Sequence, residues 1–91
     1  MDNNNILLKA NDIVFKRKEE KKRMYGPFSE SMDHAAGIAS TILKKNITTQ
    51  DMYICMTALK LSRQMHKHKE DNLLDAIAYL AGLNDYNENN I

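Results

Sequence analysis

Apolar residues recur along the chain at intervals of three and four, and this helical spacing predicts four helices. The first is expected over residues 6–23, where Ile6 and Ala10 begin an apolar stripe that gives way to a run of mixed charges. Gly26 and Pro27 follow, and proline disfavours helical geometry in the residue before it. The first helix should therefore end before this pair.

The second helix is expected to begin at Ser29, a good N-cap, and its apolar face runs as far as Leu43. Two lysines and Asn46 come next, and asparagine tolerates the left-handed geometry that often closes a helix. Small residues dominate positions 35–40, including Gly37. We therefore expect another helix to approach this segment closely.

Thr48 and Asp51 have the spacing of a capping box and should start the third helix. Nearly every residue over 52–61 is apolar, including Cys55, which we expect to pack rather than react. A helix that is apolar all round is buried on all sides, and a 91-residue chain has little protein to cover one. The pattern therefore predicts a homo-oligomer.

The fourth helix is expected over residues 70–81, with Gly82 just past its end and a polar, loosely ordered tail over 84–91. Residues 1–83 then form a single helical domain. The predicted fold class is all-α: a four-helix domain, oligomeric, whose last two helices make a hydrophobic C-terminal hairpin.

Composition and charge narrow the function. Thirteen basic and twelve acidic residues leave a formal charge of +1, which does not favour nucleic acid as a partner. No segment approaches the roughly 18 consecutive apolar residues that a membrane span needs, and the first residues lack the basic start of a secretory signal. One cysteine excludes an internal disulfide. A cytoplasmic protein with no membrane partner is expected.

The most informative segment is basic and lies at the predicted end of the third helix. Lys60, Arg63 and Lys67 project from one side, and two aspartates stand one turn apart on the next helix. Cations at a helix end also suit the helix dipole, so a solvated helix end is one interpretation. The other is a mixed pocket that holds phosphate with its cations and ribose or base edges with its carboxylates.

Two tyrosines are also candidates. Tyr25 either covers one end of the core or stacks on a nucleobase, and Tyr79 is expected to be a core residue whose hydroxyl reaches an edge. The candidate ligand-binding residues are Tyr25, Lys60, Arg63, His66, Lys67, Asp71, Asp75 and Tyr79.

Metal chemistry has weaker support. Asp71 and Asp75 are spaced to share Mg²⁺, but hydrolysis needs further carboxylates, for which Glu30, Asp33, Glu19 and Glu20 are candidates. His66 is separated from the next histidine by one residue, and such a pair points to different sides of a helix. No catalytic residue, metal ligand or cofactor is assigned, and whether the protein is an enzyme stays open.

Several short motifs, in order, resemble a family of small phage-encoded proteins of unknown function. The resemblance covers about residues 10–82 and implies a phage or prophage origin and a role inside the infected host cell. Its motifs are Tyr25-Gly26, Ile47-Thr48-x-x-Asp51, Leu59-Lys60-x-x-Arg63 and Glu70-Asp71-x-x-x-Asp75-x-x-x-Tyr79.

The chain also resembles, more faintly, the all-α nucleotide pyrophosphohydrolases of the MazG type, which hold Mg²⁺ between acidic motifs on facing helices. Glu30 and Asp33 match one such motif, whereas Glu70 is followed by Leu73 where the second needs an acid. The leading hypothesis is a non-catalytic nucleotide-binding phage protein that sequesters a nucleotide signal of host defence. The alternatives are a Mg²⁺-dependent nucleotide hydrolase and a helical protein that binds a host protein.

Overall fold

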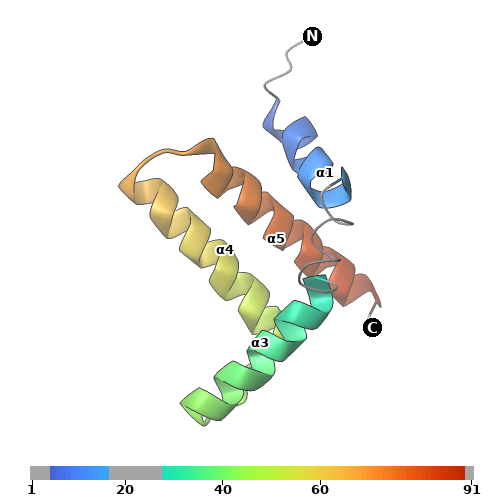
Figure 1. Cartoon of the computed structure of the whole chain (residues 1–91), viewed down its shortest axis with the longest axis vertical. Coiled ribbons are helices and arrows are strands. Elements are labelled where there is room, and N and C mark those ends of the chain that lie inside the picture. Colours follow the sequence, from blue (N-terminus) through green and yellow to red (C-terminus); the bar gives the residue numbers. More distant parts are fainter. Residues whose placement is uncertain (1–4, 17–27, 90–91) are drawn as a thin grey trace.

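The computed structural model describes residues 5–16 and 28–89, which form four α-helices and no strand. These helices are α1 (Ile6–Lys16), α3 (Phe28–Leu43), α4 (Thr49–His66) and α5 (Glu70–Asn89) (Figure 1). None of them is long and apolar enough to cross a membrane. The all-α prediction is confirmed for this part of the chain.

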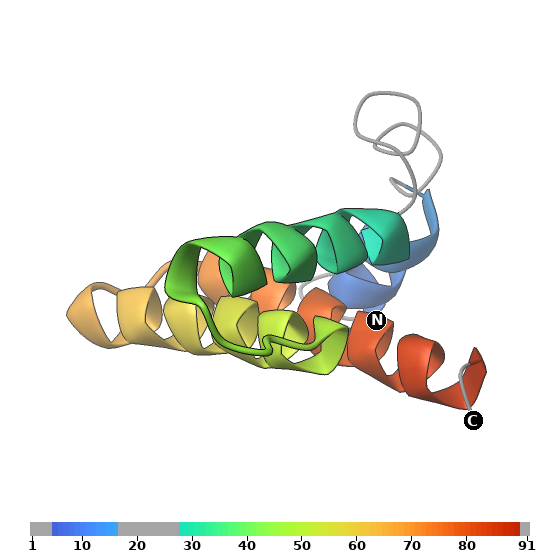
Figure 2. The same ribbon diagram turned by 90° about the horizontal axis from the view of Figure 1, so that it is seen from below.

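Helices α4 and α5 form an antiparallel hairpin, which is the most extensive packing between elements. Figure 2 shows α3 on one side of the layer that the hairpin makes, with α1 next to α5. The Lys9 ammonium lies 2.7 Å from the Glu70 carboxylate and ties α1 to the start of α5. The hairpin is therefore the scaffold to which the other two helices attach.

Among the side chains that the structure describes, the buried ones are mainly short. The apolar ones are Ala10, Met32, Ala36, Tyr53, Leu74 and Ala76, and Thr57 is polar. The hydroxyl of Thr57 donates to the backbone oxygen of Tyr53 in the preceding turn, at 2.9 Å. Tyr53 and Thr57 thus form the buried side of α4.

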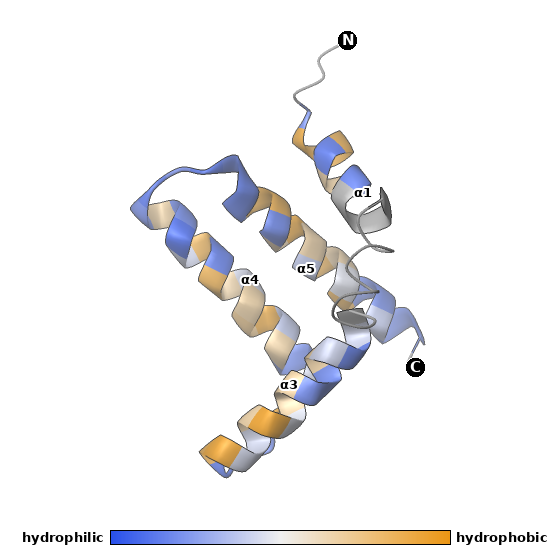
Figure 3. Ribbon diagram, viewed as in Figure 1, coloured by the Kyte–Doolittle hydropathy of each residue, from blue (hydrophilic) through white to orange (hydrophobic). Residues whose placement is uncertain are grey.

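Over residues 29–43 of α3, the buried side chains are Met32 and Ala36, and none after Ala36 is buried. The helix extends past the N-terminal end of α4, so Ile38, Ile42 and Leu43 at its apolar end are exposed (Figure 3). Cys55 of α4 is also exposed, so the expectation that it packs in the core is wrong. Its helix uses Tyr53 and Thr57 as its buried side, and Cys55 points elsewhere.

The ends of α3 differ slightly from those expected. The helix already includes Phe28, so Ser29 is not its N-cap. Lys44, with φ 55°, adopts the left-handed geometry expected of Asn46. Ser40 then holds the turn, because its hydroxyl accepts from the Ile47 N–H at 2.9 Å and donates to the Ile47 carbonyl at 3.1 Å.

The predicted capping box of α4 is confirmed. The Thr48 hydroxyl accepts from the backbone N–H of Asp51 at 3.1 Å, and the Asp51 carboxylate accepts from the backbone N–H of Thr48 at 2.9 Å. Two backbone donors that the helix start leaves without partners are satisfied in this way.

The predicted end of α5 is wrong. The helix runs through Gly82 to Asn89 instead of stopping at Ala81, so residues 84–89 are helical and not a loosely ordered tail. Glycine inside a helix costs about 1 kcal/mol relative to alanine. Packing offsets this cost, because the ring of Tyr86 lies 6.1 Å from that of Tyr53.

The first predicted helix is confirmed over residues 6–16. Its expected continuation over residues 17–23 lies outside the described residues, and so does Tyr25.

Gly37 gives a direct test of helix propensity. A Cβ atom built there meets no other atom within 4 Å, so the expected close approach of another helix to Gly37 is absent. The substitution Gly37→Ala should therefore raise the free energy of unfolding by about 0.5–1 kcal/mol. Urea unfolding followed by circular dichroism measures this change. As a control, Ala39→Gly should lower the free energy of unfolding by a similar amount. A Gly37→Ala variant that is no more stable than the wild type would contradict the open, helical environment of Gly37.

Candidate functional site

An ion pair joins the two helices of the hairpin. The Lys60 ammonium of α4 lies 3.0 Å from the Asp75 carboxylate of α5, and the two side chains are 17% and 38% exposed. Helical spacing brings both residues to the seam between the helices, and the aliphatic stem of Lys60 is covered while solvent can still reach Asp75. The pair combines a cation and an acceptor at one accessible point.

Tyr79 lies one turn after Asp75 and beside this pair. Burial raises the pKa of its phenol above the usual 10.0, the Lys60 charge lowers it and the Asp75 charge raises it. The phenol is therefore protonated at neutral pH and can donate a hydrogen bond. Lys60, Asp75 and Tyr79 together are called the ion-pair cluster below.

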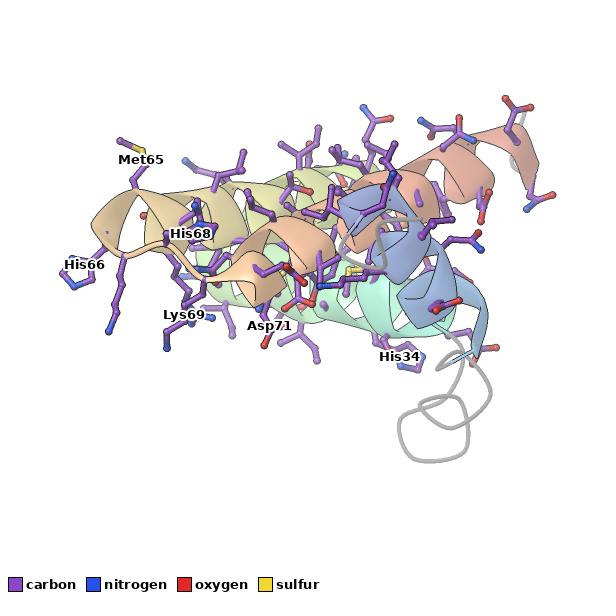
Figure 4. All side chains as sticks on the ribbon, turned by 90° about the horizontal axis from the view of Figure 1, so that it is seen from above. His34, Met65, His66, His68, Lys69 and Asp71 are labelled. Carbon is purple, nitrogen blue, oxygen red and sulfur yellow. The ribbon has the colours of Figure 1, made fainter. Side chains whose placement is uncertain are left out.

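Arg63 extends the basic side of α4. It stands one turn after Lys60 and is exposed, and its backbone oxygen accepts from the N–H of Lys67 at 3.1 Å as the helix ends. Met65 points away from α3 in Figure 4. Residues two apart in a helix differ by about 200°, so Arg63 lies on the side of the hairpin that faces α3.

Three candidates of the hairpin remain. Lys67 is the exposed C-cap of α4 with extended backbone geometry, so it does not continue the helical side of Lys60 and Arg63 as expected. The other two diverge. Asp71 points toward the side that carries α3 (Figure 4), the side on which helical spacing also places Arg63. His66 instead projects outward from the tip of the hairpin. The structure thus brings Lys60, Asp75 and Tyr79 together, puts Arg63 and Asp71 on the same side, and leaves His66 apart.

The turn between α4 and α5 is held by Gln64. Its side-chain oxygen accepts from the backbone N–H of Lys69 at 3.1 Å, and its Nε2 lies 2.6 Å from Nδ1 of His68. His68 is thereby held against the turn while His66 points outward (Figure 4). The two histidines therefore do not converge on a common point.

Of the carboxylates considered for Mg²⁺, Glu19 and Glu20 lie outside the described residues, and those that are described do not gather at one point. Asp33 accepts a hydrogen bond from the Thr49 hydroxyl at the start of α4. Thr49 and Lys60 are separated by about 16 Å along the helix axis, at 1.5 Å per residue. Asp33 is thus remote from Asp75, and within residues 5–16 and 28–89 no group of three or more histidine, cysteine or acidic side chains is placed to hold a metal ion.

A groove lies between α1 and α5, and the sequence did not predict it. It has a volume of about 260 Å³, and its lining residues are Leu7, Ala10, Asn11, Ile77, Ala81, Asn84 and Asp85. The sequence signal was available, since polar Asn84 and Asp85 follow an apolar run, but both were assigned to a tail. The groove presents no cation to a phosphate, in contrast to the ion-pair cluster.

Tyr53 is the largest fully buried side chain among the described residues, and its titration is a second test of the packing. Burial raises the pKa of its phenol, and the nearby charges of Asp33 and Asp85 raise it further. A phenol whose pKa is higher in the folded chain than in the unfolded chain stabilises the fold. This contribution is fully present at pH values below the pKa of the unfolded chain. That stability is lost as pH rises through the folded pKa.

We therefore expect the free energy of unfolding to fall as the pH rises above the usual phenol pKa of about 10. The substitution Tyr53→Phe should reduce this slope, because one of the two raised phenols is removed. Urea unfolding at a series of alkaline pH values measures the slope, and an identical slope in both proteins would be inconsistent with the environment of Tyr53.

Residues 5–87 match the model of a family described as a domain of unknown function (DUF6378), and the chain belongs to that family. No curated protein matches the chain. No solved structure matches it either.

Proposed function

We propose that this member of the DUF6378 family binds a phosphate-bearing nucleotide on the charged side of the α4–α5 hairpin and releases it unchanged. The charged side is defined by Lys60, Arg63, Asp71, Asp75 and Tyr79. The ion pair between Lys60 and Asp75, with Tyr79 beside it, is the observation that carries the proposal. Three polar groups of different kinds meet there, and solvent reaches them.

Lys60 and Arg63 suit the phosphate. They stand one turn apart on α4, and an arginine fork binds two phosphate oxygens at once while a lysine supplies a point charge. A phosphate oxygen can replace the Asp75 carboxylate as the partner of the Lys60 ammonium. This exchange keeps the lysine paired and releases the carboxylate for the ligand.

Asp75 and Tyr79 suit the rest of a nucleotide. The released carboxylate accepts hydrogen bonds from ribose hydroxyls or from an amino group of a base, and the protonated phenol donates one. Asp71, on the same side one turn earlier, adds a second acceptor near the end of the hairpin. The chemical match is therefore to a ribonucleotide with exposed phosphates.

Binding without turnover is favoured by the placement of the acids. A Mg²⁺-dependent nucleotide hydrolase using Asp71 and Asp75 is the alternative, in line with the resemblance to MazG-type enzymes. It needs an additional carboxylate, and Asp33 is engaged by Thr49 at the far end of α4. The two described acids assigned to the site, Asp71 and Asp75, both lie on α5.

The proposal extends to the setting in which such binding is useful. The motif resemblance points to a phage-encoded protein in the cytoplasm of an infected cell, where a homo-oligomer would sequester a nucleotide signal of host defence. The apolar surface that the single chain leaves exposed supports the oligomer, since exposed patches of this kind mark interaction sites.

A third possibility is a helical protein that docks on a host protein. The exposed apolar end of α3, with Ile38 and Ile42 one turn apart, is the observation that favours it. Such a protein would bind a partner chain and no small molecule.

Titration calorimetry separates the three functions. The purified chain is titrated with ATP, ADP-ribose, cyclic AMP and a cyclic dinucleotide, and each mixture is then incubated with MgCl₂ and analysed for products. We expect saturable binding of at least one ligand and its recovery intact. Turnover that needs Mg²⁺ and is lost in Asp75→Asn supports the hydrolase, and no binding of any ligand rules out the proposed function.

A further inference from the structure

The side of the hairpin away from α3 carries an apolar face. Ile54, Ala58, Leu61 and Met65 recur at intervals of four, three and four along α4, so they share the side on which Met65 points away from α3 (Figure 4). No described helix lies on this side of the hairpin (Figure 2).

Helix α5 continues the same face. Asp71 points toward the α3 side, and Leu80, nine positions later, is about two and a half turns on and thus points the opposite way. Leu73 lies two turns before Leu80 on the same side. The face is defined by Ile54, Ala58, Leu61, Met65, Leu73 and Leu80, and is called the open face.

The open face is accessible and without charge. Ile54 is 49% exposed, Leu61 46%, Met65 89% and Leu80 51%. The one charged residue of α4 between positions 52 and 62 is Lys60, which turns toward Asp75. The ion-pair cluster and the open face therefore use different sides of the hairpin.

We infer that the open face binds the open face of a second copy of this chain, with the paired helices antiparallel. In this register Ile54 lies opposite Met65 of the second copy, and Ala58 lies opposite Leu61. Each pairing occurs twice about a two-fold axis, and a small residue meets a large one at the centre. The sequence of α4 is thus complementary to itself.

Helix α5 independently places the two-fold axis at nearly the same level along the hairpin. Antiparallel pairing puts Leu73 opposite Leu80 of the second copy, with the two-fold axis between residues 76 and 77. On α4 the axis passes between residues 59 and 60. The ion pair places Lys60 level with Asp75, so the two centres lie within about one residue of each other along the hairpin.

The size of the open face fits a dimer. Helix α4 has 18 residues and is about 27 Å long, and two neighbouring helices present a flat area on the order of 500 Å². The accessible surface of such a corrugated face is larger, which approaches the roughly 800 Å² per partner of a standard interface. This inference deepens the self-association in the proposed function but does not require nucleotide binding.

Disulfide trapping without any nucleotide tests the register. Ile54→Cys and Met65→Cys are made separately in a Cys55→Ser background, and one of them carries a mass tag. Oxidation of the mixture should give the heterodimer, while each variant alone gives much less dimer. Ile38→Cys, exposed on α3, is the matched control and should form no specific dimer with either.

A second measurement does not depend on cysteine. Sedimentation over a dilution series should show the wild-type dimer, a monomer for Leu61→Glu and a dimer for the control Ile42→Glu, each with an unchanged helical spectrum. If Leu61→Glu does not fold, the disulfide result decides. Three results would each overturn the inference, whatever nucleotide calorimetry shows. The first is a wild type that sediments as a monomer, and the second is more dimer from each cysteine variant alone than from their mixture. The third is a mixture that forms no more dimer than the Ile38→Cys control.

Discussion

Tyr53→Ala should lower the free energy of unfolding by about 3–5 kcal/mol, the usual cost of removing a large buried aromatic side chain. Tyr53 is 1% exposed, and its ring packs against Tyr86 at the end of α5. Its loss leaves a cavity where α4 and α5 meet. Domains of this size are stable by about 5–15 kcal/mol, so the variant should lie close to its unfolding threshold.

Urea unfolding at a fixed protein concentration measures this effect. Tyr53→Phe, which keeps the ring, is the control and should lose far less. A loss below about 1 kcal/mol for Tyr53→Ala would contradict the packing of α5 beyond Gly82, because Tyr53 would then be no more costly to truncate than a surface residue.

Lys60→Met should weaken nucleotide binding by about 10- to 150-fold, which corresponds to a charge-assisted hydrogen bond of about 1.5–3 kcal/mol. Methionine retains most of the side-chain length and its apolar contacts but removes the ammonium. The Asp75 carboxylate, left without its partner, then also repels the phosphate. Both effects act in the same direction.

Titration calorimetry with whichever nucleotide the wild type binds measures the loss. Lys45→Met is the matched control, because Lys45 is an exposed lysine in the turn after α3. It should change affinity less than twofold at moderate salt, since exposed charges are screened beyond about 10 Å. Equal affinities of the wild type and Lys60→Met would place the ligand elsewhere.

Local signals in the sequence predicted the helices well. The capping box at Thr48 was predictable because both partners lie within four residues of each other. The end of α5 was not predictable in this way. The helix is extended by Tyr86, whose ring packs against the ring of Tyr53, 33 positions earlier in the sequence. Gly82 is a stop signal only where no such packing exists.

The candidate site was predictable in part for the same reason. Spacing alone placed Lys60 and Arg63 on one side of α4 and Asp75 on the neighbouring helix. It could not show that Lys60 and Asp75 form a pair, which depends on the relative rotation of two helices. Nor could it show that His66 lies at the tip of the hairpin, since that direction depends on where α4 ends.

An NMR titration tests most directly whether the charged side of the hairpin holds the ligand. Amide spectra of ¹⁵N-labelled protein are recorded while ADP-ribose or a cyclic nucleotide is added. The largest shifts should fall on residues 60–67 and 71–79. Shifts concentrated in residues 7–11 and 84–85, which line the groove between α1 and α5, or no shifts with any nucleotide, would contradict the proposed site.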